Sequence, residues 1–251
     1  MATDAFHSYP VDRQVIEDRL LVVRRAISDT ARAAGREPNE ITLVGVTKFF
    51  PAEMAQAAVL CGLQDLGENR VQELVQKRED LALLGLTPNW HLIGTLQKNK
   101  VRHLIGKTLL IHSIDSIQLL EEVSRHSQMA SCQTDILIQV NTAGESSKHG
   151  FSPIELQPAI EAALDLPGIH LRGLMTLAPL FIDANETLPV FEETWRLFRW
   201  MAETTARHES FDILSMGMSH DYIQAIRCGA TLVRIGSAIF GPRPPMPDVP
   251  A

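Results

Sequence analysis

Lys48 ends a strongly apolar run and has the surroundings of a chemical nucleophile. The run is ITLVGVTK, residues 41–48, and it is typical of a strand that is buried on both faces. Burial favours the neutral amine of a lysine, and a neutral amine attacks carbonyl groups to form Schiff bases. A lysine at a strand end can instead extend its ammonium group to solvent. The run alone is compatible with both interpretations.

Two glycine–serine segments have the composition of a phosphate site. They are SMGMSHD (215–221) and RIGSAIFG (234–241), and each leads from an apolar run into a helical pattern. Glycine lets backbone N–H groups approach an anion closely, serine hydroxyls add donors, and a helix N-terminus favours negative charge. Together with Lys48, these segments predict a site that holds a phosphate opposite an amine.

Short apolar strands that alternate with helices would position these groups. Eight runs recur, at 41–48, 65–69, 89–94, 109–115, 135–141, 170–178, 212–219 and 231–240. The segments between them have helix signals, such as Pro51 and Gly62 at the ends of one helix and the capping box of Ser152 and Glu155. Eight strand–helix units predict an α/β fold, a parallel sheet closed into a single (β/α)8 TIM-type barrel.

An amphipathic segment precedes the first predicted strand. Its apolar residues share one helical face and predict an extra N-terminal helix on the barrel: Ile16, Leu20, Val23, Ile27 and Ala31. The last ten residues contain five prolines. We therefore expect a flexible N-terminus over residues 1–12, the barrel over 13–241 and a loose, proline-rich tail over 242–251.

The polar residues of the strands gather at the carboxyl ends, where this fold has its sites. The two glycine–serine segments follow strands seven and eight, the usual phosphate-binding position. His91 lies near another such end, and its position is compatible with both a ligand contact and a hydrogen-bonded interior histidine. The nine histidines show no metal-binding spacing, so no metal is predicted.

Composition restricts the class of partner. The chain has 23 basic and 30 acidic residues, a net charge of −7, which argues against nucleic acid or an anionic membrane. Three cysteines without metal or disulfide spacing are typical of a reducing compartment. An apolar signal core and long apolar runs are absent from the sequence, so we expect a cytoplasmic protein.

An ordered set of segments identifies a resemblance to a known family. LVGVTK, LGENRVQEL, WHLIGTLQKNK, IHSID, ILIQVN, ESSKHGF, LRGLMTLAP, SMGMSHD and LVRIGSAIFG resemble, in order, the signature segments of the pyridoxal phosphate homeostasis proteins. The resemblance covers about residues 13–241. It implies a barrel like the N-terminal domain of alanine racemase, with pyridoxal 5′-phosphate (PLP) as cofactor.

The resemblance also implies the residues that bind the cofactor. Lys48 matches the family's Schiff-base lysine, and Arg234 matches the arginine near the pyridine nitrogen. Asn69 and His91 match polar residues that line the pocket. The phosphate-binding segments supply four residues: Met218, Ser219, Gly236 and Ser237. Ser237 stands where threonine is commoner, which preserves the hydroxyl donor.

The same residues favour a carrier over an enzyme. An arginine cannot accept a proton, so Arg234 would leave the ring nitrogen neutral and the cofactor a weak electron sink. A racemase needs a second acid/base, and of the two tyrosines we expect Tyr222 to pack near the phosphate and not to act as that acid. We expect a monomer or weak homodimer that buffers or delivers PLP, with apo-forms of PLP-dependent enzymes as partners. The alternatives are a PLP-dependent amino-acid racemase or lyase and a cofactor-free Schiff-base aldolase.

Overall fold

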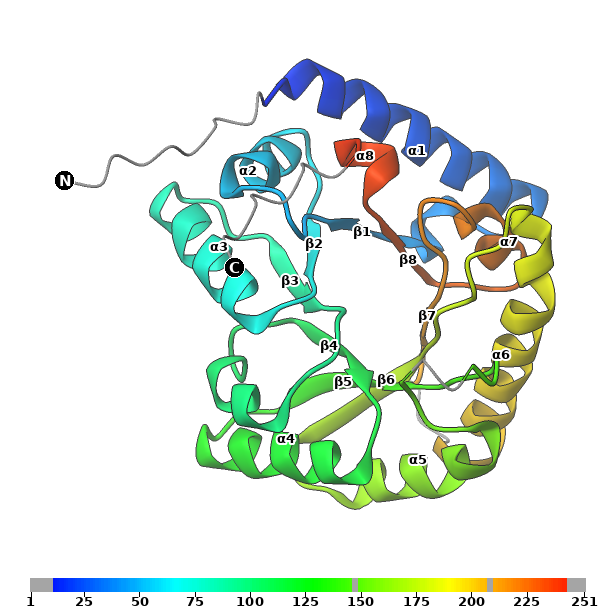
Figure 1. The fold of residues 1–251 in the computed structure, drawn as a ribbon. Coiled ribbons are helices and arrows are strands. Elements are labelled where there is room, and N and C mark those ends of the chain that lie inside the picture. Colours follow the sequence, from blue (N-terminus) through cyan, green and yellow to red (C-terminus); the bar gives the residue numbers. More distant parts are fainter. Residues whose placement is uncertain (1–10, 146–148, 207–209, 243–251) are drawn as a thin grey trace, which may run out of the picture.

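The chain forms a closed barrel of eight parallel strands surrounded by helices (Figure 1). The computed structural model describes residues 11–145, 149–206 and 210–242. The strands pair in chain order and β8 closes on β1, as the eight apolar runs predict. They are β1 (Thr42–Val46), β2 (Asp65–Glu68), β3 (Asn89–Leu92), β4 (Leu110–Ile114), β5 (Thr134–Gln139), β6 (Ile169–Met175), β7 (Ile213–Ser215) and β8 (Leu232–Ile235).

Helices follow the strands and form the outer ring (Figure 1). The α-helices are α2 (Ala52–Leu60), α3 (Val71–Leu83), α4 (Ile117–Met129), α5 (Leu156–Asp165), α6 (Leu188–Met201), α7 (Tyr222–Arg227) and α8 (Ser237–Phe240). Four short 3-10 helices lie in the described residues: η1 (Pro38–Glu40), η2 (Lys98–His103), η3 (Pro153–Glu155) and η4 (Ala184–Thr187). A short π-helix, η5 (Ala202–Ala206), follows α6. The capping box predicted for Ser152 and Glu155 is present at η3.

The predicted N-terminal helix is α1 (Arg13–Ala33), which packs on α2, α7 and α8. The carboxylate of Asp12 caps it by accepting from the N–H groups of Gln14 and Val15. All five residues of the predicted apolar face are buried. Of the predicted N-terminal segment 1–12 and tail 242–251, only residues 11, 12 and 242 belong to the described part of the chain.

Two separate apolar clusters follow from the alternation of side chains along the strands. The larger one lies between the strands and the helices. The smaller one gathers side chains from five strands inside the barrel: Val44, Leu110, Leu137, Met175 and Leu232. The barrel interior also contains polar side chains, and these bear on the site described below. Across the described residues, no helix is both long and apolar enough to span a bilayer.

Several predicted strands are longer than the observed ones. The run at 41–48 ends as a strand at Val46, so Lys48 lies in the following turn. The run at 231–240 divides into β8 and the short helix α8. Ile239 and Phe240 of α8 are buried against the core. Because they are as apolar as the residues of β8, the sequence pattern did not show where the strand ends and the helix begins.

Candidate functional site

A strained turn presents Lys48 at the carboxyl end of β1. The N–H of Thr47 donates to the carbonyl oxygen of Gly67 at 3.1 Å, which continues the pairing of β1 with β2. Phe49 then has φ +69°, a left-handed conformation that is uncommon outside glycine and concentrates at functional sites. The guanidinium of Arg70 lies 6.0 Å from the centre of the Phe49 ring. Lys48 itself is half-buried.

A buried ion pair holds the backbone of this turn in place. Lys77 Nζ of α3 donates to Glu68 Oε1 at 2.6 Å and to the carbonyl oxygen of Thr47 at 2.8 Å. The hydroxyl of Thr47 donates to the same carboxylate oxygen of Glu68 at 2.6 Å. Glu68 is fully buried and its Oε2 has no hydrogen-bond partner, so burial raises the pKa of this carboxyl above 4.5 despite the opposing charge of Lys77.

The loops after β7 and β8 are joined through one hydroxyl group. Ser219 Oγ accepts hydrogen bonds from the N–H groups of Gly236 at 3.1 Å and Ala238 at 3.4 Å. The hydroxyl of Ser219 still has its own proton to donate. Ser237, between the two amide donors, is exposed. The hydroxyl groups of Ser219 and Ser237 thus lie where the sequence predicts a phosphate site, while the N–H groups of Gly236 and Ala238 donate to Ser219.

Asp221 fixes the conformation of the loop after β7. Its Oδ1 accepts from the N–H of Met218 at 2.6 Å, and its side chain is almost fully buried. Burial raises the pKa of this carboxyl, an effect that the Met218 hydrogen bond and the charge of Arg234 oppose. Met218 and Ser219 are half-buried at the rim of this loop.

Arg234 is enclosed by the ends of three strands. Its Nη2 donates to the carbonyl oxygen of Thr176, just after β6, at 2.9 Å, and its Nη1 donates to Ser215 Oγ at the end of β7. The side chain is 3% exposed. Burial lowers the pKa of Arg234 to about 10, and the charge of Asp221 acts in the opposite direction. The guanidinium therefore remains charged at neutral pH.

Asn69 and His91 lie in different surroundings. Asn69 is half-buried directly after β2, and a Cβ at Gly94 would lie 2.5 Å from its carbonyl oxygen, so this close approach requires glycine. His91 is buried inside the barrel, where its Nε2 lies 3.0 Å from Asp65 Oδ1 and its Nδ1 lies 3.0 Å from His112 Nε2. Both ring nitrogens of His91 are thus engaged within the protein, and its contact with a ligand stays a prediction.

Several of the predicted residues, Lys48, Ser219 and Gly236 among them, come together at one end of the barrel, whereas His91 lies deeper in its interior. Gly236 packs beside the end of β1, since a Cβ there would lie 3.4 Å from the carbonyl oxygen of Val46. Because β8 pairs with β1, the loop after β8 lies next to the turn that contains Lys48. The arrangement combines an amine, a buried guanidinium and two serine hydroxyl groups. It suits a ligand with a carbonyl group and an anionic group.

Sequence reasoning did not assign a supporting role to the side chains that hold these groups, although Glu68, Ser215 and Asp221 lie in segments that it placed at the strand ends. The supporting side chains are Asp65, Glu68, Lys77, His112, Ser215 and Asp221. Polar residues at alternate positions of apolar strands, such as His112 two residues after Leu110, were an available signal for an interior polar network. Their partners could not be inferred, because they lie on distant strands.

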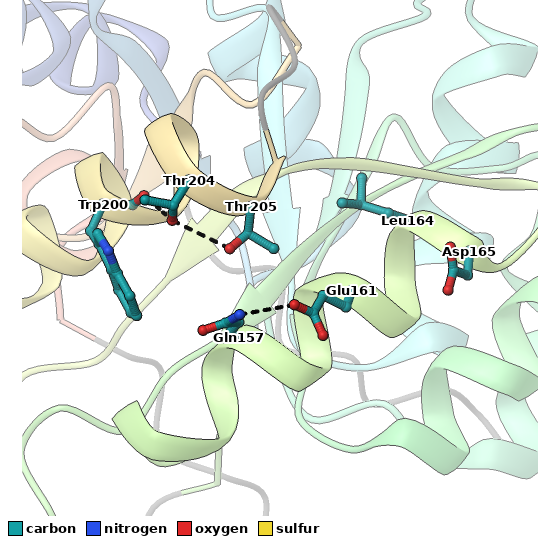
Figure 2. A pocket seen from close by; sticks show the side chains of 7 residues that line it. All are labelled: Gln157, Glu161, Leu164, Asp165, Trp200, Thr204 and Thr205. Atoms are coloured by element: carbon teal, nitrogen blue, oxygen red, sulfur yellow. Dashed lines mark hydrogen bonds between the residues drawn. The ribbon is translucent and has the colours of Figure 1, made fainter.

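A groove on the outside of the barrel lies among the helices. It has a volume of about 590 Å³ and lies between α5 and the segment that runs from the end of α6 into η5. Figure 2 shows the side chains that line it. Its floor includes the hydrogen bond that Gln157 Nε2 donates to Glu161 Oε1 at 2.9 Å. The other lining residues are Leu164, Asp165, Trp200, Thr204 and Thr205. It is open to solvent and contains none of the predicted site residues, so we do not assign the site there.

Comparison with known sequences identifies the family of the barrel. The model of the alanine racemase N-terminal domain matches residues 25–244. The pyridoxal phosphate homeostasis protein of Aquifex aeolicus (strain VF5) is 40% identical over 228 residues, which are 90% of this chain and 97% of that protein. The high coverage on both sides means that the likeness extends over the whole barrel.

Comparison with solved structures agrees. PipY of Synechococcus elongatus PCC7942, solved with PLP bound, is 32% identical with a TM-score of 0.79 and covers 90% of this chain and 100% of its own. Alanine racemase of Corynebacterium glutamicum shares the fold at 15% identity and a TM-score of 0.68, and the match covers 92% of this chain and 62% of the racemase. With its closed barrel, its N-terminal helix and its lysine after the first strand, this chain belongs to the family of pyridoxal phosphate homeostasis proteins, built on the alanine racemase N-terminal domain.

Proposed function

We propose that this protein binds PLP at the carboxyl ends of its barrel strands and holds it as a Schiff base on Lys48. The observation that carries the proposal is the meeting of the Lys48 turn with the loops that contain Ser219 and Gly236 at one barrel end. The family supports it, since relatives are named as pyridoxal phosphate homeostasis proteins and PipY was solved with PLP.

The donor groups at this end fit the chemistry of the cofactor. The amine of Lys48 suits the aldehyde, and the hydroxyl groups of Ser219 and Ser237 suit the phosphate dianion. Arg234 suits the ring nitrogen, because a guanidinium donates a hydrogen bond there without giving up its proton. When bound, PLP supplies an electron sink whose strength depends on the protonation of its ring nitrogen.

The proposed role is to buffer PLP and deliver it to apo-enzymes, and not to turn over amino acids. Arg234 facing the ring nitrogen would keep that nitrogen unprotonated and the sink weak. A racemase also needs an acid/base on the opposite face of its substrate. Tyr222 is half-buried on α7 and its pKa is raised by burial, so it is poorly suited to proton transfer at neutral pH.

Absorption spectroscopy of the purified protein tests the proposal. We expect a yellow protein whose colour survives dialysis and whose PLP becomes irreversibly attached after borohydride reduction. A colourless protein that cannot be loaded with PLP would overturn the proposal and favour a cofactor-free Schiff-base aldolase. Incubation of the loaded protein with a panel of L-amino acids separates carrier from enzyme, since turnover well above that of free PLP would favour the racemase or lyase.

A further inference from the structure

A continuous chain of hydrogen bonds crosses the barrel interior from Arg234. Ser215 Oγ accepts from the guanidinium of Arg234 and lies 2.9 Å from His112 Nδ1 on β4, across the barrel. The Nε2 of His112 lies 3.0 Å from His91 Nδ1, and the Nε2 of His91 lies 3.0 Å from Asp65 Oδ1. Asp65 begins β2, and its side chain is 18% exposed at the amino end of that strand.

When both histidine rings are neutral, the two ends of the chain set the direction of every bond within it. An arginine only donates and an ionised carboxylate only accepts. Ser215 Oγ accepts from Arg234, so its single proton is available for His112 Nδ1. His112 must then donate from Nε2 to His91 Nδ1, and His91 from Nε2 to Asp65. In this neutral arrangement each ring carries its single proton on Nε2.

A competing arrangement places a second proton on His91. An imidazolium at His91 would donate from both nitrogens, and His112 would donate from Nδ1 to Ser215 Oγ. That oxygen would then receive two donors, and its own proton would have no acceptor among the two partners that the structure gives it. Burial, with the nearby charges of His91 and Arg234, lowers the pKa of His112 well below 6.5, so this ring is neutral in both arrangements. The unpaired proton of Ser215 is what disfavours the arrangement with a protonated His91.

The neutral arrangement stabilises the buried cation. Within the described residues, Arg234 forms no ion pair within 4 Å, although its side chain is fully enclosed. Each O–H or N–H dipole of the chain turns its negative end toward the guanidinium, and the chain finishes on a carboxylate. Aligned hydrogen bonds in a low-dielectric interior polarise and strengthen one another.

We propose that Ser215, His112, His91 and Asp65 form a relay that keeps Arg234 charged and fixed in place beneath the ligand. The relay residues are positioning residues. The assignment rests on the proposed function only for the identity of the ligand beside Arg234. His91 then acts on the site through Arg234 and not by lining it. The relay explains why two histidines lie inside a barrel whose other interior side chains are mainly apolar.

Nitrogen-15 NMR of the histidine rings in the ligand-free protein tests the relay directly. We expect two buried rings with Nε2–H and unprotonated Nδ1 at about pH 8. Their signals should be assigned by their loss in the His91→Gln and His112→Gln variants, with His103→Gln on the exposed η2 as the matched control. A doubly protonated ring at His91, or an Nδ1–H ring at His112, would overturn the proposal.

The loaded protein provides the second test. His112→Leu removes the donor and the acceptor, whereas His112→Gln keeps one of each. We expect His112→Leu to shift the absorption band of bound PLP and raise its Kd about fivefold, with His112→Gln closer to the wild type and His103→Gln unchanged. Asp65→Asn, at the more exposed end of the relay, gives the same spectral test if His112→Leu does not fold.

The two proposals fail in different ways. If the wild-type protein takes up no PLP, the proposed function is wrong, and the NMR states of the histidines still decide the relay. If the wild-type protein binds PLP but His112→Leu and Asp65→Asn match it in spectrum and Kd, the relay does not position Arg234.

Discussion

Lys77 Nζ lies 2.6 Å from Glu68 Oε1, and this buried pair joins α3 to the carboxyl end of β2. The same ammonium donates to the carbonyl oxygen of Thr47, which precedes Lys48. The pair therefore fixes the ends of β1 and β2 relative to each other, next to the turn that contains the proposed Schiff-base lysine. Because one carboxylate oxygen of Glu68 has no partner, the pair depends strongly on its cation.

The Lys77→Met variant should be severely destabilised. It leaves the Glu68 carboxylate buried without a counter-charge, which costs about 3–5 kcal/mol of unfolding free energy. Urea unfolding followed by circular dichroism measures the loss. Adding Glu68→Gln to the variant should restore part of it. Lys107→Met, which removes a partly exposed pair 4.0 Å from Glu79, is the matched control and should cost less than about 1 kcal/mol. Equal losses at the two lysines would contradict this account.

The raised pKa of Glu68 predicts a pH dependence of stability. The unfolded chain releases this proton near pH 4.5, and the folded chain releases it at higher pH. Between the two pKa values the folded state holds more protons, so the unfolding free energy falls as pH rises through this window and is constant above it. Comparison with Glu68→Gln isolates the contribution. A wild-type protein that gains stability relative to the variant over this range would show that Lys77 outweighs burial.

The arrangement of the barrel could be predicted from the sequence because its strands are buried on both faces and appear as separate apolar runs. Even the short, polar run at 65–69 is a strand, β2. The ends were less predictable. Apolar residues continue beyond β1 into the strained turn at Phe49 and beyond β8 into the buried helix α8, and hydrophobicity alone does not distinguish these conformations.

The candidate site was predictable only where chemistry and chain position coincide. Lys48 lies in the turn after β1 and Ser219 in the loop after β7, so the fold itself places them at the carboxyl end. The relay was not predictable, because its bonds join residues far apart in the chain: His112 and Ser215 are 103 positions apart. A strand pattern shows which side chains face the interior, but the partner of an interior polar group depends on the tilt and closure of the whole barrel.

Replacing Ser219 and Ser237 together with alanine should weaken the retention of PLP. Each hydrogen bond to a charged group contributes about 1.5–3 kcal/mol, so we expect the Kd to rise about tenfold or more. Removal of Ser219 Oγ also frees the N–H groups of Gly236 and Ala238, which can then face the phosphate and limit the loss. Fluorescence titration with PLP measures the change.

The control for the serine pair is Thr87→Ala, an exposed hydroxyl just before β3 at the amino ends of the strands. It should leave the Kd unchanged. Retention of PLP through dialysis by the double variant at the wild-type level would place the phosphate elsewhere.

Lys48→Ala should abolish the covalent attachment of PLP while leaving the barrel folded. The backbone of the turn is held by Thr47, through its bonds to Gly67, Glu68 and Lys77, and none of these uses the Lys48 side chain. We therefore expect a wild-type circular dichroism spectrum, no yellow colour and nothing for borohydride to fix. PLP should still bind through the phosphate donors but wash out faster. Mass spectrometry of the reduced wild-type protein should find the pyridoxyl group on the peptide that contains Lys48, and attachment at Lys98 or Lys100 instead would refute the proposed site.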